Sequence, residues 1–100
     1  MDNHKLYFRK NSGAWENSGN PTSGSTGTGA VSITSGKEYY FACATITSGG
    51  NKVFSANFGN GFFGTTAITS AGSNGNGSLF EYDVPSGYYA LNTKNINTYG

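Results

Sequence analysis

Hydrophobic and polar residues alternate most clearly in the last quarter of the chain, between Ser78 and Leu91. Apolar side chains occupy every second position there, at Phe80, Tyr82 and Val84, and an acidic residue separates each from the next. This period of two predicts a strand with one buried face. Pro85 ends the strand because it has no N–H to donate, and Gly87 favours a turn before the apolar run resumes at Tyr88. The end of the chain therefore predicts two strands joined by a turn and docked on a surface built earlier.

Similar short patterns recur through the earlier part of the chain. In residues 38–47 both faces of an extended segment are largely apolar, so we expect a central strand that is covered on both sides. The tetrapeptide Ser48-Gly49-Gly50-Asn51 follows it and predicts a hairpin turn. Other strands are expected at residues 5–10, 14–16, 30–34, 52–58 and 65–69, with a turn at Asn11-Ser12-Gly13 after the first. These patterns predict about seven short strands in all.

Polar segments rich in Gly, Ser and Asn separate the strands. Residues 17–29 and 70–77 are expected to be long loops, and residues 92–100 a polar tail. No credible amphipathic helix is predicted, because good helix formers are scarce. The sequence therefore predicts a single all-β domain over residues 1–100, with the architecture of an antiparallel β-sandwich or jelly roll.

The composition agrees with this fold class. Only 11% of the residues are charged, against about 25% in average proteins, and Gly supplies 16 of the 100 residues, against about 7%. Aromatic residues make up 15%, which is too many for a disordered polar tract. The net charge of +1 offers no electrostatic basis for binding nucleic acid or an anionic membrane, and no apolar run is long enough to span a bilayer. We therefore expect neither nucleic acid nor membrane insertion.

Candidate catalytic residues are few, and each has a simpler interpretation. Cys43 is the only cysteine, so no intrachain disulfide can form, and its apolar neighbours predict a small buried residue rather than a nucleophile paired with His4. Glu81 and Asp83 share one strand face, which favours a solvated surface over the carboxylate pair of a glycosidase. The sequence has no His/Cys cluster for zinc. We therefore expect no enzyme activity, no metal and no cofactor.

Two loop segments have features of ligand-binding loops. Residues 73–77 offer amide and hydroxyl oxygens but no carboxylate, so they are poorly suited to Ca²⁺. Residues 59–64 have the G-x-G-x-x-G spacing of a dinucleotide-binding loop, but no helix can follow at Thr65-Thr66-Ala67. We expect a bent strand at residues 59–64 instead.

Four aromatic residues are candidates for contact with a ligand or a partner. Sugar rings stack on exposed aromatic rings, and Asn side chains can hydrogen-bond to sugar hydroxyls. The candidates are Trp15, Tyr88, Tyr89 and Tyr99. Most aromatic residues of a small β-domain lie in its core, so both roles stay open at this point.

Three segments resemble sequences of the SPRY (B30.2-like) family. Residues 82–96, YDVPSGYYALNTKNI, resemble the closing Y-x-x-P-S-G-(F/Y)-x-A-L-N-T-K-N-L segment of SPRY-like proteins from bacterial viruses and metagenomes. Residues 6–13, LYFRKNSG, resemble the L-x-F-x-x-N-G hairpin with one residue inserted, and residues 56–60, ANFGN, resemble the A-N-F-G segment. The three segments follow the order that the family has.

The resemblance implies a bent sandwich of two antiparallel sheets, similar to concanavalin-type lectin folds. The chain corresponds to the C-terminal half of such a domain, and residues 36–40, GKEYY, only echo the N-terminal G-K-W-Y-W-E type motif. We therefore expect an apolar face that another copy or another subunit covers.

The family's functions are not catalytic. Its viral members resemble tail-fibre and other virion proteins of bacteriophages, and its eukaryotic members are protein-interaction modules. The resemblance thus implies a structural or adhesive protein of the virion or the extracellular space that acts through protein–protein assembly. The alternative is a lectin-like module that recognises host surface glycans.

Overall fold

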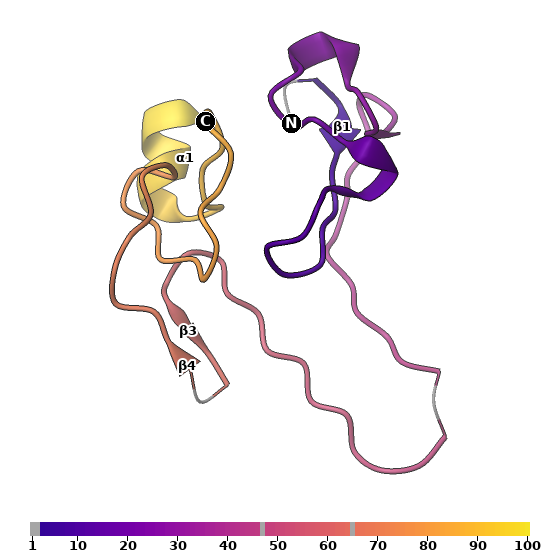
Figure 1. Cartoon of the computed structure of the whole chain (residues 1–100), viewed down its shortest axis with the longest axis vertical. Coiled ribbons are helices and arrows are strands. Elements are labelled where there is room, and N and C mark those ends of the chain that lie inside the picture. Colours follow the sequence, from indigo (N-terminus) through magenta and orange to yellow (C-terminus); the bar gives the residue numbers. More distant parts are fainter. Residues whose placement is uncertain (1–2, 47, 65) are drawn as a thin grey trace.

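The computed structural model describes residues 3–46, 48–64 and 66–100. The chain forms three parts: an N-terminal region (residues 3–36), an extended arm (residues 37–46 and 48–58) and a C-terminal region (residues 59–64 and 66–100). The two regions lie beside each other at one end of the molecule, and the arm runs away from them and returns as an open arch (Figure 1). In chain order the elements are β1 (Lys5–Leu6), η1 (Glu16–Ser18), η2 (Gly24–Thr26), β2 (Val31–Ser32), β3 (Phe62–Phe63), β4 (Thr66–Ala67) and α1 (Thr93–Tyr99).

The fold is β-rich and mostly non-helical, with few antiparallel strands. In the described parts of the chain, β1 pairs with β2 and β3 pairs with β4, each as a two-stranded antiparallel sheet. The expected sandwich of about seven strands is therefore not what the chain forms. The strands are two residues long, and the longest predicted one, at residues 38–47, has no strand pairing over its described residues 38–46. Thr47, at its end, lies outside the described residues.

The N-terminal region contains the predicted first hairpin. Arg9 bridges Trp15 in antiparallel fashion, the Glu16 amide donates to the Phe8 carbonyl at 2.9 Å, and the Gly13 amide closes the turn onto Lys10. The turn prediction at residues 11–13 is therefore confirmed. Of the strand expected at residues 30–34, only β2 forms, and it pairs in register with β1. The loop at residues 17–29 contains η2 and most of η1.

The arm is extended, and its described residues belong to neither of the two sheets. Its apolar side chains are consequently open to solvent; they are Tyr39, Tyr40, Phe41, Ile46, Val53, Phe54 and Phe58. Cys43 is exposed as well, so the prediction that it is a small buried residue is wrong. The sequence pattern of residues 38–46 is that of a covered strand, but no second layer lies over either face.

The C-terminal region is organised around a glycine bend and a few buried polar groups. Asn57, at the end of the arm, donates to the Leu79 carbonyl at 2.7 Å and accepts from the Gly59 and Gly61 amides. Gly61 has φ of +85°, and a Cβ there would collide with the Ile68 carbonyl oxygen and the Leu79 side chain. Only glycine fits so close an approach, and the bend leads into β3 and β4.

The strand predicted at residues 80–84 does not form, although the turn after it does. The chain bends at Glu81 and Tyr82, and Leu79 makes only an isolated parallel bridge to Asn60. The Tyr88 amide donates to the Pro85 carbonyl at 3.1 Å, and Gly87 has φ of +85°. The prediction of a Pro-Ser-Gly turn is confirmed, and that of the preceding strand is wrong.

The tail expected at residues 92–100 is a helix. Asn92 is the N-cap of α1: its side-chain oxygen accepts from the Asn95 amide at 3.0 Å, and its carbonyl accepts from the Ile96 amide. An isolated helix of seven residues would not persist in water, so tertiary contacts must hold it. Asn95 and its neighbours Ser78 and Ala90 supply them, because all three are only 4–5% exposed.

Candidate functional site

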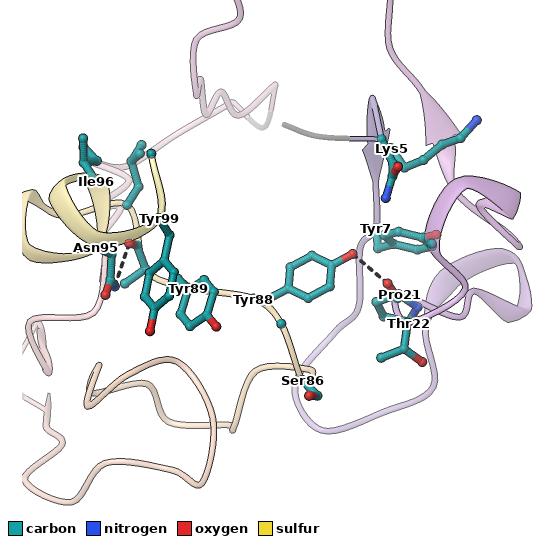
Figure 2. A pocket seen from close by; sticks show the side chains of 16 residues that line it. Lys5, Tyr7, Pro21, Thr22, Ser86, Tyr88, Tyr89, Asn95, Ile96 and Tyr99 are labelled. Atoms are coloured by element: carbon teal, nitrogen blue, oxygen red, sulfur yellow. Dashed lines mark hydrogen bonds between the residues drawn. The ribbon is translucent and has the colours of Figure 1, made fainter.

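A pocket of about 520 Å³ lies where the N-terminal and C-terminal regions meet, and tyrosines dominate its wall (Figure 2). The N-terminal region contributes Tyr7 and Pro21, and the C-terminal region contributes the segment after the Pro-Ser-Gly turn and one side of α1. Its described lining residues are Asn3, Lys5, Tyr7, Pro21, Thr22, Gly24, Ser86, Gly87, Tyr88, Tyr89, Ala90, Leu91, Asn95, Ile96, Tyr99 and Gly100. We refer to it as the tyrosine pocket.

Tyr88 spans the pocket from one region to the other. Its hydroxyl donates to the Pro21 carbonyl oxygen at 2.8 Å, a contact between residues 67 positions apart (Figure 2). Partial burial raises the pKa of Tyr88 above its usual value, and the neighbouring Tyr7 hydroxyl raises it further. Tyr88 is therefore a neutral hydrogen-bond donor at physiological pH, and it ties the two walls together.

Tyr89 and Tyr99 form a stacked pair on the opposite wall. Their ring centroids are 3.8 Å apart and the planes differ by 7°. The pKa of Tyr89 is raised first by hydrogen bonding with Tyr99, then by charge repulsion from that residue and by desolvation. Because Tyr99 belongs to α1, formation of the helix completes this part of the pocket.

Asn95 is the most constrained polar group of the lining. Its amide nitrogen donates to the Ala90 carbonyl at 3.0 Å and to Ser78 Oγ at 3.4 Å, and its oxygen accepts from Asn76 at 3.0 Å. Buried amides need such partners, since leaving one unsatisfied costs roughly 1–3 kcal/mol. Asn95 therefore fixes the backbone from which Tyr89 projects, rather than offering free donors to a ligand.

Three of the four aromatic candidates come together, and the fourth does not. Tyr88, Tyr89 and Tyr99 all line the tyrosine pocket, whereas Trp15 lines two neighbouring cavities of about 330 and 400 Å³. The Arg9 guanidinium lies 4.7 Å from the Trp15 ring centroid, and Tyr7 meets the ring edge-on at 6.3 Å. One face of Trp15 is therefore already occupied.

Asp83 has a structural role that the alternation pattern did not predict. We expected it on a solvated face beside Glu81, but its carboxylate accepts from the Ser73 and Asn74 amides at 2.9 and 3.1 Å. These bonds tie the loop at residues 70–77 to the segment before Pro85. Its backbone carbonyl also accepts from Arg9 at 3.0 Å, which links it to the N-terminal region.

The other candidates do not form a reactive group. Within the described residues, no three His, Cys, Asp or Glu side chains are placed to hold a metal ion. Cys43 lies exposed on the arm, and the glycine-rich segment at residues 59–64 leads into β3 instead of a helix. In the parts of the chain that the structure describes, no helix is long and apolar enough to cross a membrane.

Sequence reasoning missed Tyr7, Pro21 and Asn95 as parts of the pocket. Tyr7 and Pro21 are distant from the C-terminal tyrosines in sequence, and no local pattern signals that they meet. For Asn95 a signal existed: an Asn three positions before it provides an N-cap, which predicts a helix start at Thr93.

The pocket offers aromatic rings, hydroxyl groups and backbone carbonyls, and Lys5 is the one charged side chain among its described lining residues. Such a surface suits uncharged, hydroxyl-rich ligands. No protein-family model matches this chain, and no curated protein or solved structure matches it at a significant level.

Proposed function

We propose that this chain is a non-enzymatic structural or adhesive component of a bacteriophage virion, such as a tail fibre, and acts by assembling with other chains. The observation that carries this proposal is the arm, whose apolar side chains are exposed in the single chain. The resemblance of residues 82–96 to the closing segment of virion-type SPRY domains supports the assignment to a virion.

Exposure of this kind is costly in a soluble protein. The arm presents several large apolar side chains on an extended backbone whose described residues belong to no sheet, and both features invite other chains. A SPRY-like sandwich would satisfy both needs if its missing strands came from another copy or another subunit. On this proposal the protein is part of an extracellular particle, and the sandwich exists only in the assembly.

Immunogold labelling of particles from the virus that encodes the chain tests this proposal. Antibodies against the chain should label intact particles at a fixed position. Absence of the chain from purified, disrupted particles, measured by mass spectrometry, would contradict a virion role. Antibodies against an unrelated protein of the infected cell serve as the control.

A second function, recognition of host surface glycans, is favoured by the tyrosine pocket. The stacked Tyr89 and Tyr99 rings are about half exposed, and neutral hydroxyl and amide groups surround them. On a glycan array, binding should fall at least tenfold on Tyr89→Ala and stay unchanged on Tyr40→Ala, an exposed tyrosine of the arm. Trp15→Ala alters the two neighbouring cavities but not this pocket, so it measures whether those cavities contribute to glycan binding. An array without any signal would contradict glycan recognition.

A further inference from the structure

We propose that the arm is an open β-hairpin whose two strands face each other in a fixed register. We propose further that these strands pair when the arm joins the same arm of a second copy of this chain. This inference rests on the proposed function, because it names the partner and the segment through which assembly occurs. Two independent features of the arm define the register, and its charge and exposed surface identify the partner.

The first feature is the reversal at Gly49-Gly50. Both residues have positive φ, +90° and +71°, and the chain reverses direction at this end of the arch (Figure 1). A two-residue hairpin loop of type I′ requires positive φ at both central positions, which is why glycine is favoured there. The two glycines therefore already have the positive φ values that such a loop needs, while the arch around them is still open.

The second feature is a ring contact at the other end of the arm. Phe41 and Phe58 meet edge to face, with centroids 6.2 Å apart and planes at 89°. Counting outwards from the Gly-Gly loop, a hairpin pairs Ser48 with Asn51 and, further along, Phe41 with Phe58. These two phenylalanines fall at a non-hydrogen-bonded pair, where opposite side chains approach most closely. The contact and the turn thus specify the same register, although they are far apart along the arm.

The same register pairs Ile46 with Val53, both of which are almost fully exposed in the single chain. It also divides the apolar side chains between two faces, with Phe41, Phe54 and Phe58 on one of them. An isolated two-stranded hairpin is marginal in water and needs further strands or a packing layer. This requirement explains why the two strands of the proposed hairpin form no ladder over their described residues in the single chain.

Charge and length favour a second copy as the partner. Between Glu38 and Glu81 the sequence contains one charged residue, Lys52, and it contains no proline between Pro21 and Pro85. Edge strands that avoid self-pairing carry charges or proline, and this segment has almost none of either. Identical arms therefore meet with little charge repulsion, and the arm offers few charges to a charged partner.

The exposed area is also sufficient. The five aromatic side chains of the arm are 46–84% exposed, and a large aromatic side chain has roughly 150–250 Å² to bury, so together with Ile46 and Val53 they supply several hundred Å² per copy. A stable interface buries about 800 Å² per partner, and backbone pairing along the strands contributes the remainder. We therefore expect an antiparallel two-fold arrangement in which the two arms form one sheet.

Sedimentation velocity of the full chain over a range of concentrations tests this inference. The wild-type chain should dimerise, and Phe54→Lys should weaken the dimer about a hundredfold or more, because the change enters a two-fold interface twice. The matched control is Phe8→Lys, since Phe8 has the same 57% exposure as Phe54 but lies outside the arm. Both side chains are exposed, so the folded C-terminal region should survive, and circular dichroism of α1 verifies it.

Cross-linking adds a positional readout. Cys43 is the only cysteine and lies in the arm, so mild oxidation should form a disulfide between the two copies of a dimer. The control is the double variant Cys43→Ser/Thr69→Cys, which moves the cysteine out of the arm and should cross-link more slowly. A wild-type chain that stays monomeric to its solubility limit would overturn the inference, and so would a dimer that Phe54→Lys leaves intact. Either result leaves the virion role to be decided by particle labelling. Conversely, an arm-dependent dimer from a chain absent from particles would contradict only the proposed function.

Discussion

The C-terminal region and the arm both contain many aromatic residues but bond their backbone groups to very different extents. The two parts also share a long stretch that is almost free of charge. In the C-terminal region, Asn95 and Asp83 bind backbone groups of other segments, and Asn57 at the end of the arm binds the Leu79 carbonyl of this region. The arm's described residues 38–46 have no backbone strand pairing and no covering layer. The comparison teaches that side chains hydrogen-bonded to distant backbone groups can fix a region with little hydrophobic core. Alternating apolar residues cannot do so when no second layer covers them.

The largest effect is expected from removing the buried amide of Asn95. Asn95→Ala deletes bonds to Ala90, Ser78 and Asn76, and we expect the C-terminal region to lose about 2–4 kcal/mol of stability. Hydrogen exchange of the α1 amides measures the loss. Asn97→Ala, at an exposed position of the same helix, is the matched control and should change little. Equal protection in the two variants would contradict the role given to Asn95.

A smaller loss is expected when a side chain is added at the glycine bend. A Cβ at Gly59 would lie 2.5 Å from Ala90 Cβ, and φ there is +99°. We expect Gly59→Ala to cost about 2–3 kcal/mol in urea unfolding, through steric overlap added to backbone strain. Gly36→Ala isolates the strain, since Gly36 also has positive φ but has nothing within 4 Å, and it should cost about 1 kcal/mol.

Alkaline pH should weaken the joint between the two regions. The folded state raises the pKa values of Tyr88 and Tyr89, so it binds their protons more tightly than the unfolded chain does. That stabilisation is fully present below about pH 10, the unfolded value, and is lost as pH rises through the raised folded values. Urea midpoints compared at about pH 9 and pH 11 measure this loss.

The tyrosine variants assign the alkaline effect to the pocket. Tyr88→Phe should reduce the pH dependence to the part that Tyr89 supplies, and it removes the hydrogen bond to Pro21 at a cost of about 1 kcal/mol at neutral pH. Tyr40→Phe, in the exposed arm, should leave the pH dependence as it is in the wild type. A wild-type midpoint that rises with pH would contradict the proposed sign.

The smallest effect is expected in the arm itself. Ile46→Ser removes a fully exposed apolar side chain, so the stability of the dilute, monomeric chain should change by less than about 0.5 kcal/mol. Urea unfolding at low protein concentration measures it. Ala90→Ser, a polar change at a buried position, provides the contrasting case. A large loss at Ile46 would show that the arm is covered in the single chain.

The sequence predicted local turns well, because single residues dictate them. Gly13 and Gly87 mark turns that form where expected, and Gly61 allows the bend before β3. Strand pairing was predicted less well, since alternation in residues 38–46 gives a preference for extended backbone but cannot supply a second layer. The helix α1 was missed because its composition is unfavourable and contacts with distant residues stabilise it; the Asn92 cap was the local signal that could have indicated it.

The candidate site was predictable in part. Three tyrosines near the end of the chain were selected as contact residues, and they do share one pocket. Trp15 lies in neighbouring cavities, where the Arg9 guanidinium covers its ring, and no spacing rule separates it from the other three aromatic candidates. Asp83 was assigned to solvent by its strand face, but without a strand the carboxylate turns to the loop amides of Ser73 and Asn74.

The bonds from Tyr88 to Pro21 and from Arg9 to Asp83 connect the two ends of the molecule without using the arm. If the peptide backbone were cut near Gly50, these two hydrogen bonds would still connect the N-terminal and C-terminal fragments. The same bonds would limit how far the tyrosine pocket changes shape when the arm binds a neighbouring subunit.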